Sequence, residues 1–241
     1  VALVGKYTEL PDAYKSINEA FIHAGAMNDS KVKVRYVKAE KVNDQSAAEL
    51  FEGVSGIFVA PGSGSRGVDG KIAAVKYARE NNIPFFGIGL GMHCATVEFA
   101  RNVLGYEDAA SAELDTTTKH PVVALMEENK AEKGSTRRIG GYVCTLDAES
   151  KAAKAYGITS VMERHSNSFE FNTDYREAFE AAGMKCVGIN PETQLVEVLE
   201  LENHPWFIAT QYHPEYKSTV EHPAPLFVSF IDAALKYSEN K

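Results

Sequence analysis

Short apolar runs alternate with helix-length amphipathic stretches through the first hundred residues of the chain. Residues 2–4, 56–60 and 84–88 are such runs, and each is followed by a stretch with the length and polarity of a surface helix. Apolar strands that alternate with helices predict a sheet buried between two helix layers. We therefore expect an α/β fold with a mostly parallel central sheet flanked by helices.

The rest of the chain follows this pattern less regularly. Residues 32–37 are expected to form a strand, and residues 105–134, whose periodicity is weak, a loop with helical pieces. Residues 196–201 and 206–211 are expected to be a closing antiparallel pair. Further helices are expected at residues 47–51, 68–81, 91–104, 175–182 and 225–237. No repeat or linker interrupts the sequence, so residues 1–241 are expected to form a single domain.

The first helix is expected to begin at Pro11, because proline is favoured in the first turn of a helix. Apolar side chains then recur at helical spacing, which predicts one face packed against the sheet. That face comprises Tyr14, Ile17, Ala20, Phe21 and Ala24.

Charge and hydropathy exclude several classes of protein. The 241 residues carry 25 Lys and Arg against 33 Asp and Glu, a net charge of −8. Because no basic cluster is present to neutralise phosphates, we do not expect nucleic acid as a partner. No apolar run approaches the roughly 20 residues of a membrane helix, and the start of the sequence has no signal-peptide pattern. A cytoplasmic location without membrane association is therefore expected.

The three cysteines, Cys94, Cys144 and Cys186, are odd in number and match no metal or redox spacing. We expect them to be reduced thiols in the core, and we expect no metal site. Cys94 also lies five residues beyond Gly89, about 7 Å along a helix at roughly 1.5 Å per residue. That distance is too large for this thiol to act in place of a side chain at Gly89.

A strand that leads through closely spaced glycines into a helix is the most informative stretch of the chain. Residues 87–91 have the form G-x-Nu-x-G, a turn that exposes its central residue at a helix N-terminus. The central residue is Gly89, so the frame is present without a nucleophile. A dinucleotide fingerprint would require glycine or alanine at Met92, and a phosphate-binding loop ending at Lys71 would require Ser or Thr at Ile72. No cofactor is therefore expected.

A second chemical signal is His213-Pro214-Glu215, at the end of an expected strand. A carboxylate two residues from a histidine can orient the imidazole as a general base. The triplet alone is also common in ordinary loops.

Together these stretches resemble the class I glutamine amidotransferases. Residues 87–93 are similar to the G-I-C-L-G-M-Q elbow of that family, and residues 211–216 to its Q-F-H-P-E-F motif. Residues 4–7, 66–72, 77–81 and 163–165 narrow the resemblance to the glutaminase domain of the CTP synthases, and it extends from Val1 to Leu235. The amidoligase domain of that family, which binds ATP and UTP, has no counterpart in this sequence.

The resemblance also marks departures at the positions that carry the family's chemistry. It implies a nucleophilic cysteine where Gly89 stands, a glutamine at His93, an aromatic residue at Ser63 and a carboxylate-binding arginine at Ser166. Glu113, at the place of the acid that contacts the amino end of the substrate, remains. The implied catalytic positions are Gly89, His213 and Glu215. The implied substrate-binding positions are Gly62, Ser63, Gly64, Leu90, His93, Glu113 and Ser166.

Three hypotheses follow from this pattern. In the first, the chain is a pseudo-glutaminase, or its pocket is retuned for a carboxylate- or amide-bearing small molecule. A separate amidoligase chain is then a candidate partner. In the second, the chain is a hydrolase or lyase that acts on another substrate through His213 and Glu215, with His93 as a further contributor. The third hypothesis is an engineered variant of an ordinary glutaminase domain.

Two smaller questions stay open at this point. His93 could approach His213 and, with His165 or Glu113, supply ligands for a metal, although a histidine at a helix start more often forms hydrogen bonds. Residues 137–138, both arginine, lie either at the rim of the pocket or on a solvated turn.

Overall fold

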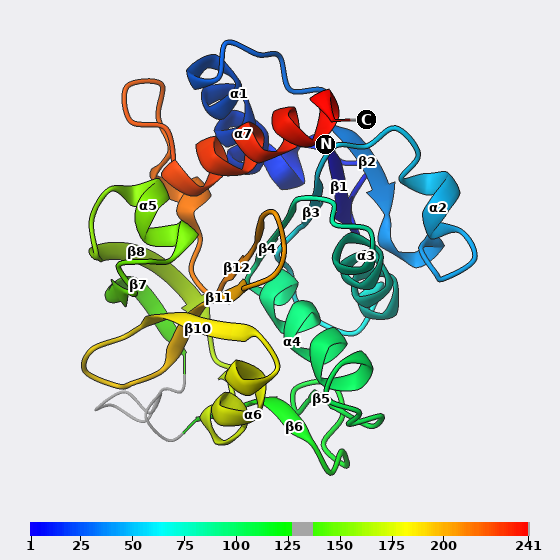
Figure 1. The fold of residues 1–241 in the computed structure, drawn as a ribbon. Coiled ribbons are helices and arrows are strands. Elements are labelled where there is room, and N and C mark those ends of the chain that lie inside the picture. Colours follow the sequence, from blue (N-terminus) through cyan, green and yellow to red (C-terminus); the bar gives the residue numbers. More distant parts are fainter. Residues whose placement is uncertain (127–136, 241) are drawn as a thin grey trace.

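In the computed structural model, which describes residues 1–126 and 137–240, a nine-stranded sheet runs through the middle of the protein (Figure 1). Its order is β2-β1-β3-β4-β12-β11-β10-β7-β8. The first five of these strands run parallel to one another. They are β2 (Arg35–Lys38), β1 (Ala2–Gly5), β3 (Ile57–Val59), β4 (Phe85–Ile88) and β12 (Phe207–Thr210).

Four antiparallel strands extend the sheet beyond β12. They are β11 (Val196–Leu201), β10 (Met184–Ile189), β7 (Arg138–Leu146) and β8 (Ser160–Asn167). The expected antiparallel pair is confirmed as β11 and β12. It does not close the sheet, because β12 also pairs in parallel with β4 and therefore lies in the interior.

Helices cover both faces of the sheet, so the expected α/β class and mostly parallel sheet are confirmed (Figure 1). On one face pack α1 (Lys15–Met27), α5 (Lys151–Tyr156) and α7 (Pro225–Glu239). On the other pack α2 (Ala47–Leu50), α3 (Val68–Glu80), α4 (Leu90–Asn102) and α6 (Arg176–Ala181). α5 was not expected from the sequence.

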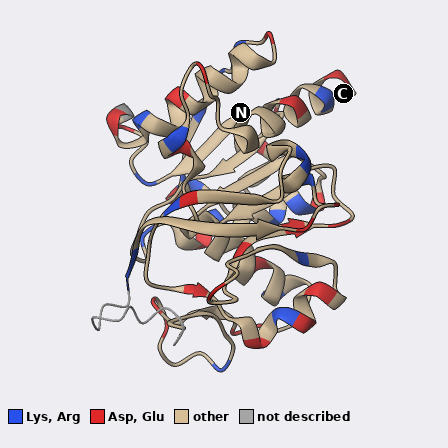
Figure 2. Cartoon of the chain, turned by 90° about the vertical axis from the view of Figure 1, so that its left-hand side faces the viewer, with Lys and Arg blue, Asp and Glu red and all other residues tan. Residues whose placement is uncertain are grey.

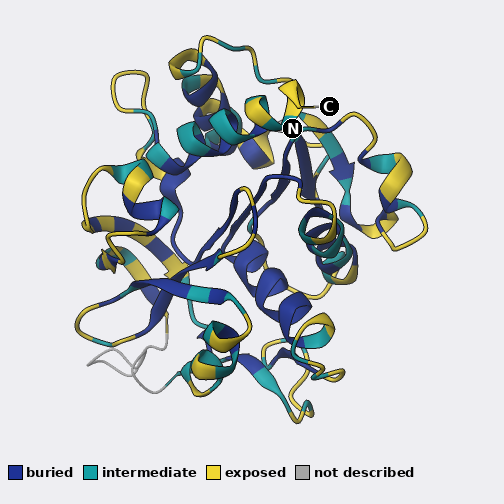
Figure 3. Ribbon diagram, in the orientation of Figure 1, coloured by how far each residue is buried: buried dark blue, intermediate teal, exposed yellow. Residues whose placement is uncertain are grey.

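Strand alternation divides the apolar residues between these two faces. Phe85 packs in the layer of α3 and α4, whereas its neighbour Phe86 packs in the layer of α1 and α7, because successive strand side chains point to opposite faces. The predicted apolar face of the first helix is buried as expected. The helix does not begin at Pro11 as an α-helix: Pro11–Tyr14 form a 3-10 turn, and α1 begins at Lys15. α4 is buried along eleven consecutive residues, Leu90 to Ala100, and is the most enclosed helix in Figure 3.

Two expectations about strands are wrong. The segment expected to be loop with helical pieces contains β5 (Ala110–Ser111) and β6 (Pro121–Ala124), which form a three-stranded sheet with β9 (Glu170–Phe171). These strands of two to four residues depend on a distant partner, so local periodicity does not reveal them; residues 127–134 of that segment lie outside the described residues. The strand expected from residue 32 begins at Arg35, which pairs with Ala2, the first residue of β1.

Charged residues lie over the outer helices and loops, with acidic and basic side chains interspersed, and the strands are mostly uncharged (Figure 2). No helix within residues 1–126 and 137–240 is long and apolar enough to cross a membrane. The three cysteines are free and buried, as expected.

His204 is buried in the turn between β11 and β12 and is held there as a neutral imidazole. Its Nε2 lies 3.2 Å from the carbonyl oxygen of Ala78, and its Nδ1 accepts a hydrogen bond from the backbone N–H of Trp206 at 3.2 Å. A proton on Nδ1 would oppose that N–H, and burial lowers the pKa of His204 to about 4.

We predict that His204 makes the protein less stable in mild acid. Its pKa rises from about 4 in the folded chain to about 6.5 on unfolding, so the unfolded chain binds the extra proton between these values. The free energy of unfolding should therefore fall as pH drops from 6.5 to 4, by up to about 3 kcal/mol from this group. Urea unfolding at pH 7, 5.5 and 4.5 measures this, and His204→Gln should flatten the profile. If the unfolding free energy of His204→Gln depends on pH as steeply as that of the parent, His204 is not the source of this pH dependence.

Candidate functional site

A cavity of about 550 Å³ opens at the carboxyl ends of the parallel strands. Segments that follow β1, β3, β4 and β12 contribute to its wall, and in parallel sheets this edge is where ligands bind. Eight of the ten expected site residues line the cavity; Gly64 and Glu215 do not. The eight are Gly62, Ser63, Gly89, Leu90, His93, Glu113, Ser166 and His213.

The turn between β4 and α4 has the geometry that its glycines predict. Gly89 has φ 56° and ψ −111°, a conformation with positive φ that glycine adopts without strain. Its N–H donates to the carbonyl oxygen of Thr210 at 2.8 Å. At Gly91 a Cβ would lie 2.3 Å from the carbonyl oxygen of Val59, so glycine lets α4 approach β3.

His213 and Glu215 form a buried pair beside this turn. His213 Nδ1 lies 2.8 Å from Glu215 Oε1, and the ring stacks on Tyr216 with centroids 5.0 Å apart. A Cβ at Gly89 would lie 3.5 Å from His213 Nε2. When Nδ1 donates to the carboxylate, Nε2 is left as an acceptor that faces the space over Gly89.

His93 lines the cavity but is already engaged. Its Nε2 lies 2.8 Å from Oε1 of Gln211, and burial lowers its pKa, which favours the neutral imidazole. The metal ligand set considered above does not form: His165 Nε2 faces Glu197 at 3.5 Å in the protein interior. Within residues 1–126 and 137–240 no three His, Cys, Asp or Glu side chains are arranged to hold a metal.

Two buried lysines hold the loop that follows β3. Lys71 Nζ donates to the carbonyl oxygen of Ala60 at 2.6 Å, and Lys6 Nζ donates to that of Ser63. Burial lowers the pKa of Lys71 to about 8. These bonds fix the backbone that brings Gly62 and Ser63 to the cavity, a role for the lysines that the sequence did not indicate.

The structure separates the two neighbouring arginines. Arg137 lines the cavity, and its Nη2 donates to Ser166 Oγ at 3.0 Å. Arg138 points into the protein interior, where its guanidinium lies 3.0 Å from Glu170 and 2.6 Å from Glu197. Of the two places that the sequence left open, Arg137 therefore lies at the rim of the pocket. Arg138 lies neither at the rim nor on a solvated turn.

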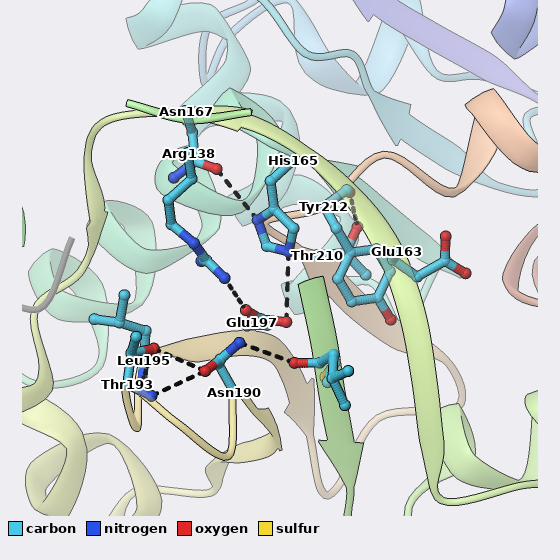
Figure 4. A network of polar contacts seen from close by, with 12 residues as sticks. Arg138, Glu163, His165, Asn167, Asn190, Thr193, Leu195, Glu197, Thr210 and Tyr212 are labelled. Carbon is cyan, nitrogen blue, oxygen red and sulfur yellow. Dashed lines mark hydrogen bonds and ion pairs between the residues drawn. The ribbon is translucent and has the colours of Figure 1, made fainter. Parts of the chain in front are cut away.

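A buried polar network lies behind the β7–β8 wall of the cavity (Figure 4). One carboxylate oxygen of Glu197 accepts a hydrogen bond from Arg138, and the other lies near His165 Nε2. The pKa of Glu197 is lowered because these hydrogen bonds and charges outweigh its burial. Asn167 Nδ2 donates to Glu170 at 2.7 Å, which ties β8 to β9.

Cys94 behaves as a core thiol, as expected. It is 1% exposed on α4, and burial raises its pKa to about 11. Because the thiolate is the nucleophilic form, this side chain is inert at neutral pH.

Comparison with known proteins places this geometry in a family. The model of the family described as glutamine amidotransferase class-I matches residues 9–233. The chain belongs to this family. The CTP synthases of Cytophaga hutchinsonii and Flavobacterium psychrophilum are 56% and 57% identical to it, over 100% and 98% of this chain. The glutaminase domain of Trypanosoma brucei CTPS with bound acivicin is 37% identical, covers 98% of this chain and 93% of that one, and superimposes with a TM-score of 0.92.

The comparisons also define how far the likeness extends. This class-I glutamine amidotransferase chain spans 45% of the Cytophaga protein and 44% of the Flavobacterium protein. The resemblance to the glutaminase domain of CTP synthases, first indicated by short motifs, is confirmed along nearly the whole chain.

We predict that Arg138→Met will lower the free energy of unfolding by about 3–5 kcal/mol. The variant retains the volume of the side chain but leaves Glu170 and Glu197 buried without their cation. Adding Glu197→Gln to this variant should recover part of the loss, because the two residues act in one network. Urea unfolding at pH 7 measures both, with Arg176→Met, which removes a partly exposed ion pair, as the control. A loss below about 1 kcal/mol would show that the network is unimportant for stability.

Proposed function

We propose that this chain keeps the small-molecule pocket of a CTP synthase-type glutaminase domain but does not hydrolyse glutamine through a thioester. The observation that carries the proposal is Gly89 at the elbow, where a Cβ would lie 3.5 Å from His213 Nε2. No side chain is available there to attack a carbonyl carbon. The expected ligand is a small molecule that bears a carboxylate or an amide.

The geometry also supports a second function, hydrolysis by water. His213 Nε2 faces the cavity and Glu215 orients the ring, so a water molecule over Gly89 would lose a proton to Nε2 as its oxygen attacks an amide or ester carbonyl. The N-terminal end of α4, where backbone N–H groups point toward the cavity, favours negative charge on the carbonyl oxygen. His213 then returns the proton to the leaving amine or alcohol as the carbonyl–heteroatom bond breaks.

A binding role alongside a synthetase remains part of the proposal. The CTP synthases that the chain resembles are more than twice its length. A separate amidoligase chain is therefore a candidate partner, and co-purification with such a chain would favour a regulatory module over a free-standing hydrolase.

The first test concerns glutamine itself. Release of glutamate and ammonia from glutamine should be undetectable over hours for the parent chain. Gly89→Cys would gain His213 as a base and a helix N-terminus that favours thiolate. It should still fall short of efficient turnover, because no arginine stands at Ser166 and His93 and Ser63 are unchanged. Adding Ser166→Arg, Ser63→Phe and His93→Gln should raise kcat/KM stepwise. Efficient turnover by the single variant would refute this account of the pocket.

The second test concerns the His213–Glu215 pair. A panel of small carboxylates, amides and esters is screened by thermal shift and by product release; a ligand at 100 times its Kd should stabilise the chain by roughly 2.7 kcal/mol. For any compound that is hydrolysed, His213→Ala should lower kcat by about 10²–10⁴-fold. Glu215→Gln should lower kcat less. His222→Ala, an exposed histidine, is the control. If His213→Ala retains full turnover, water is not activated at this site.

A further inference from the structure

The rim of the cavity at the β7–β8 pair carries an arginine that no motif indicated. Across these two strands Arg138 pairs with Asn167, and Ile139 pairs with Ser166. Arg137 therefore precedes β7 at the level where β8 ends. From there the guanidinium reaches diagonally to Ser166, and Nη2 donates to Ser166 Oγ at 3.0 Å. Both side chains line the cavity.

The charges around the cavity single out this arginine. Among the described residues that line it, Arg137 is the only Lys or Arg, and Glu113 is the only Asp or Glu. Lys6, another nearby cation, donates to the backbone carbonyl oxygen of Ser63. Arg137 therefore supplies the guanidinium that lies beside the Ser166 hydroxyl in this cavity.

We propose that Arg137, positioned by Ser166, binds the carboxylate of the ligand and sets the preference of the pocket for carboxylates over uncharged amides. The inference rests on the proposed function, since it requires a small molecule in this cavity. A guanidinium matches the two oxygens of a carboxylate better than any other side chain. The Ser166 hydroxyl accepts from Arg137 and has its own proton to donate to the same carboxylate.

The backbone beneath Arg137 is held firmly enough for this role. The next residue, Arg138, is buried between Glu170 and Glu197, which fixes the start of β7 to β9 and β11. Arg137 itself is exposed, so the attraction should weaken as salt is added.

The experiment measures Kd by calorimetry for two matched pairs of probes. Glutaramate is compared with glutaramide, and L-glutamine with L-glutaminamide; within each pair a carboxylate is replaced by a carboxamide. The parent should bind the carboxylate of each pair more tightly. Arg137→Ala should weaken carboxylate binding by about 10-fold or more and change amide binding less than about threefold. Raising salt should reduce the preference of the parent but not that of Arg137→Ala.

A second variant tests whether the side chains at positions 137 and 166 bind the same carboxylate. Arg137→Ala combined with Ser166→Arg should restore most of the carboxylate preference from the neighbouring strand. Arg176→Ala, which removes a partly exposed arginine outside the cavity, should bind as the parent does.

The outcomes separate this inference from the proposed function. If the parent binds the carboxylates and Arg137→Ala binds them equally well, or loses both members of a pair alike, Arg137 is not the anchor and only this inference is overturned. A double variant as weak as Arg137→Ala overturns the claim that Ser166 and Arg137 share one carboxylate. If the parent binds none of the four probes at millimolar concentration, the inference and the proposed small-carboxylate pocket are both overturned.

Discussion

The parallel pairing of β4 with β12 is the interaction on which the site depends. It sets Ile88 beside Thr210, and the N–H of Gly89 extends the same ladder to the Thr210 carbonyl. Two segments more than 120 residues apart in the sequence, the glycine turn at Gly89 and the His213–Glu215 loop, therefore leave the sheet side by side. A shift of this register by one residue would move every side chain of the shifted strand to the opposite face of the sheet. It would therefore change both the orientation of His213 and the shape of the cavity.

In the antiparallel half of the sheet, buried ion pairs fix the strands relative to one another, as the β4–β12 pairing does in the parallel half. Arg138 joins three strands through two carboxylates that have almost no contact with water. Replacing such an ion cluster by apolar side chains is often neutral for stability. Its value in this chain is that it fixes where β7 begins, opposite the end of β8, and hence where Arg137 and Ser166 lie at the rim.

The sequence predicts most of the first hundred residues because β1, β3 and β4 are fully buried and α1 and α3 are amphipathic, so each of these elements is visible in its own window. It misses β5 and β6, whose few residues become strands only through partners elsewhere in the chain. The pattern is the same at the site. The elbow and the His213–Glu215 pair are local motifs and could be located, whereas the His93–Gln211 contact and the different fates of Arg137 and Arg138 depend on strand register. The two lysines under the Ser63 loop carry no local signal at all.

The three enclosed thiols have a practical consequence. Burial raises the pKa of Cys94 to about 11 and that of Cys186 to about 12, and that of Cys144 higher still. With Gly89 at the elbow, the folded chain offers iodoacetamide no reactive sulfur. Alkylation of Cys94 and Cys144 must then wait for α4 or β7 to open, so mass-spectrometric labelling rates at these two positions report the opening free energy of two separate elements without any added probe.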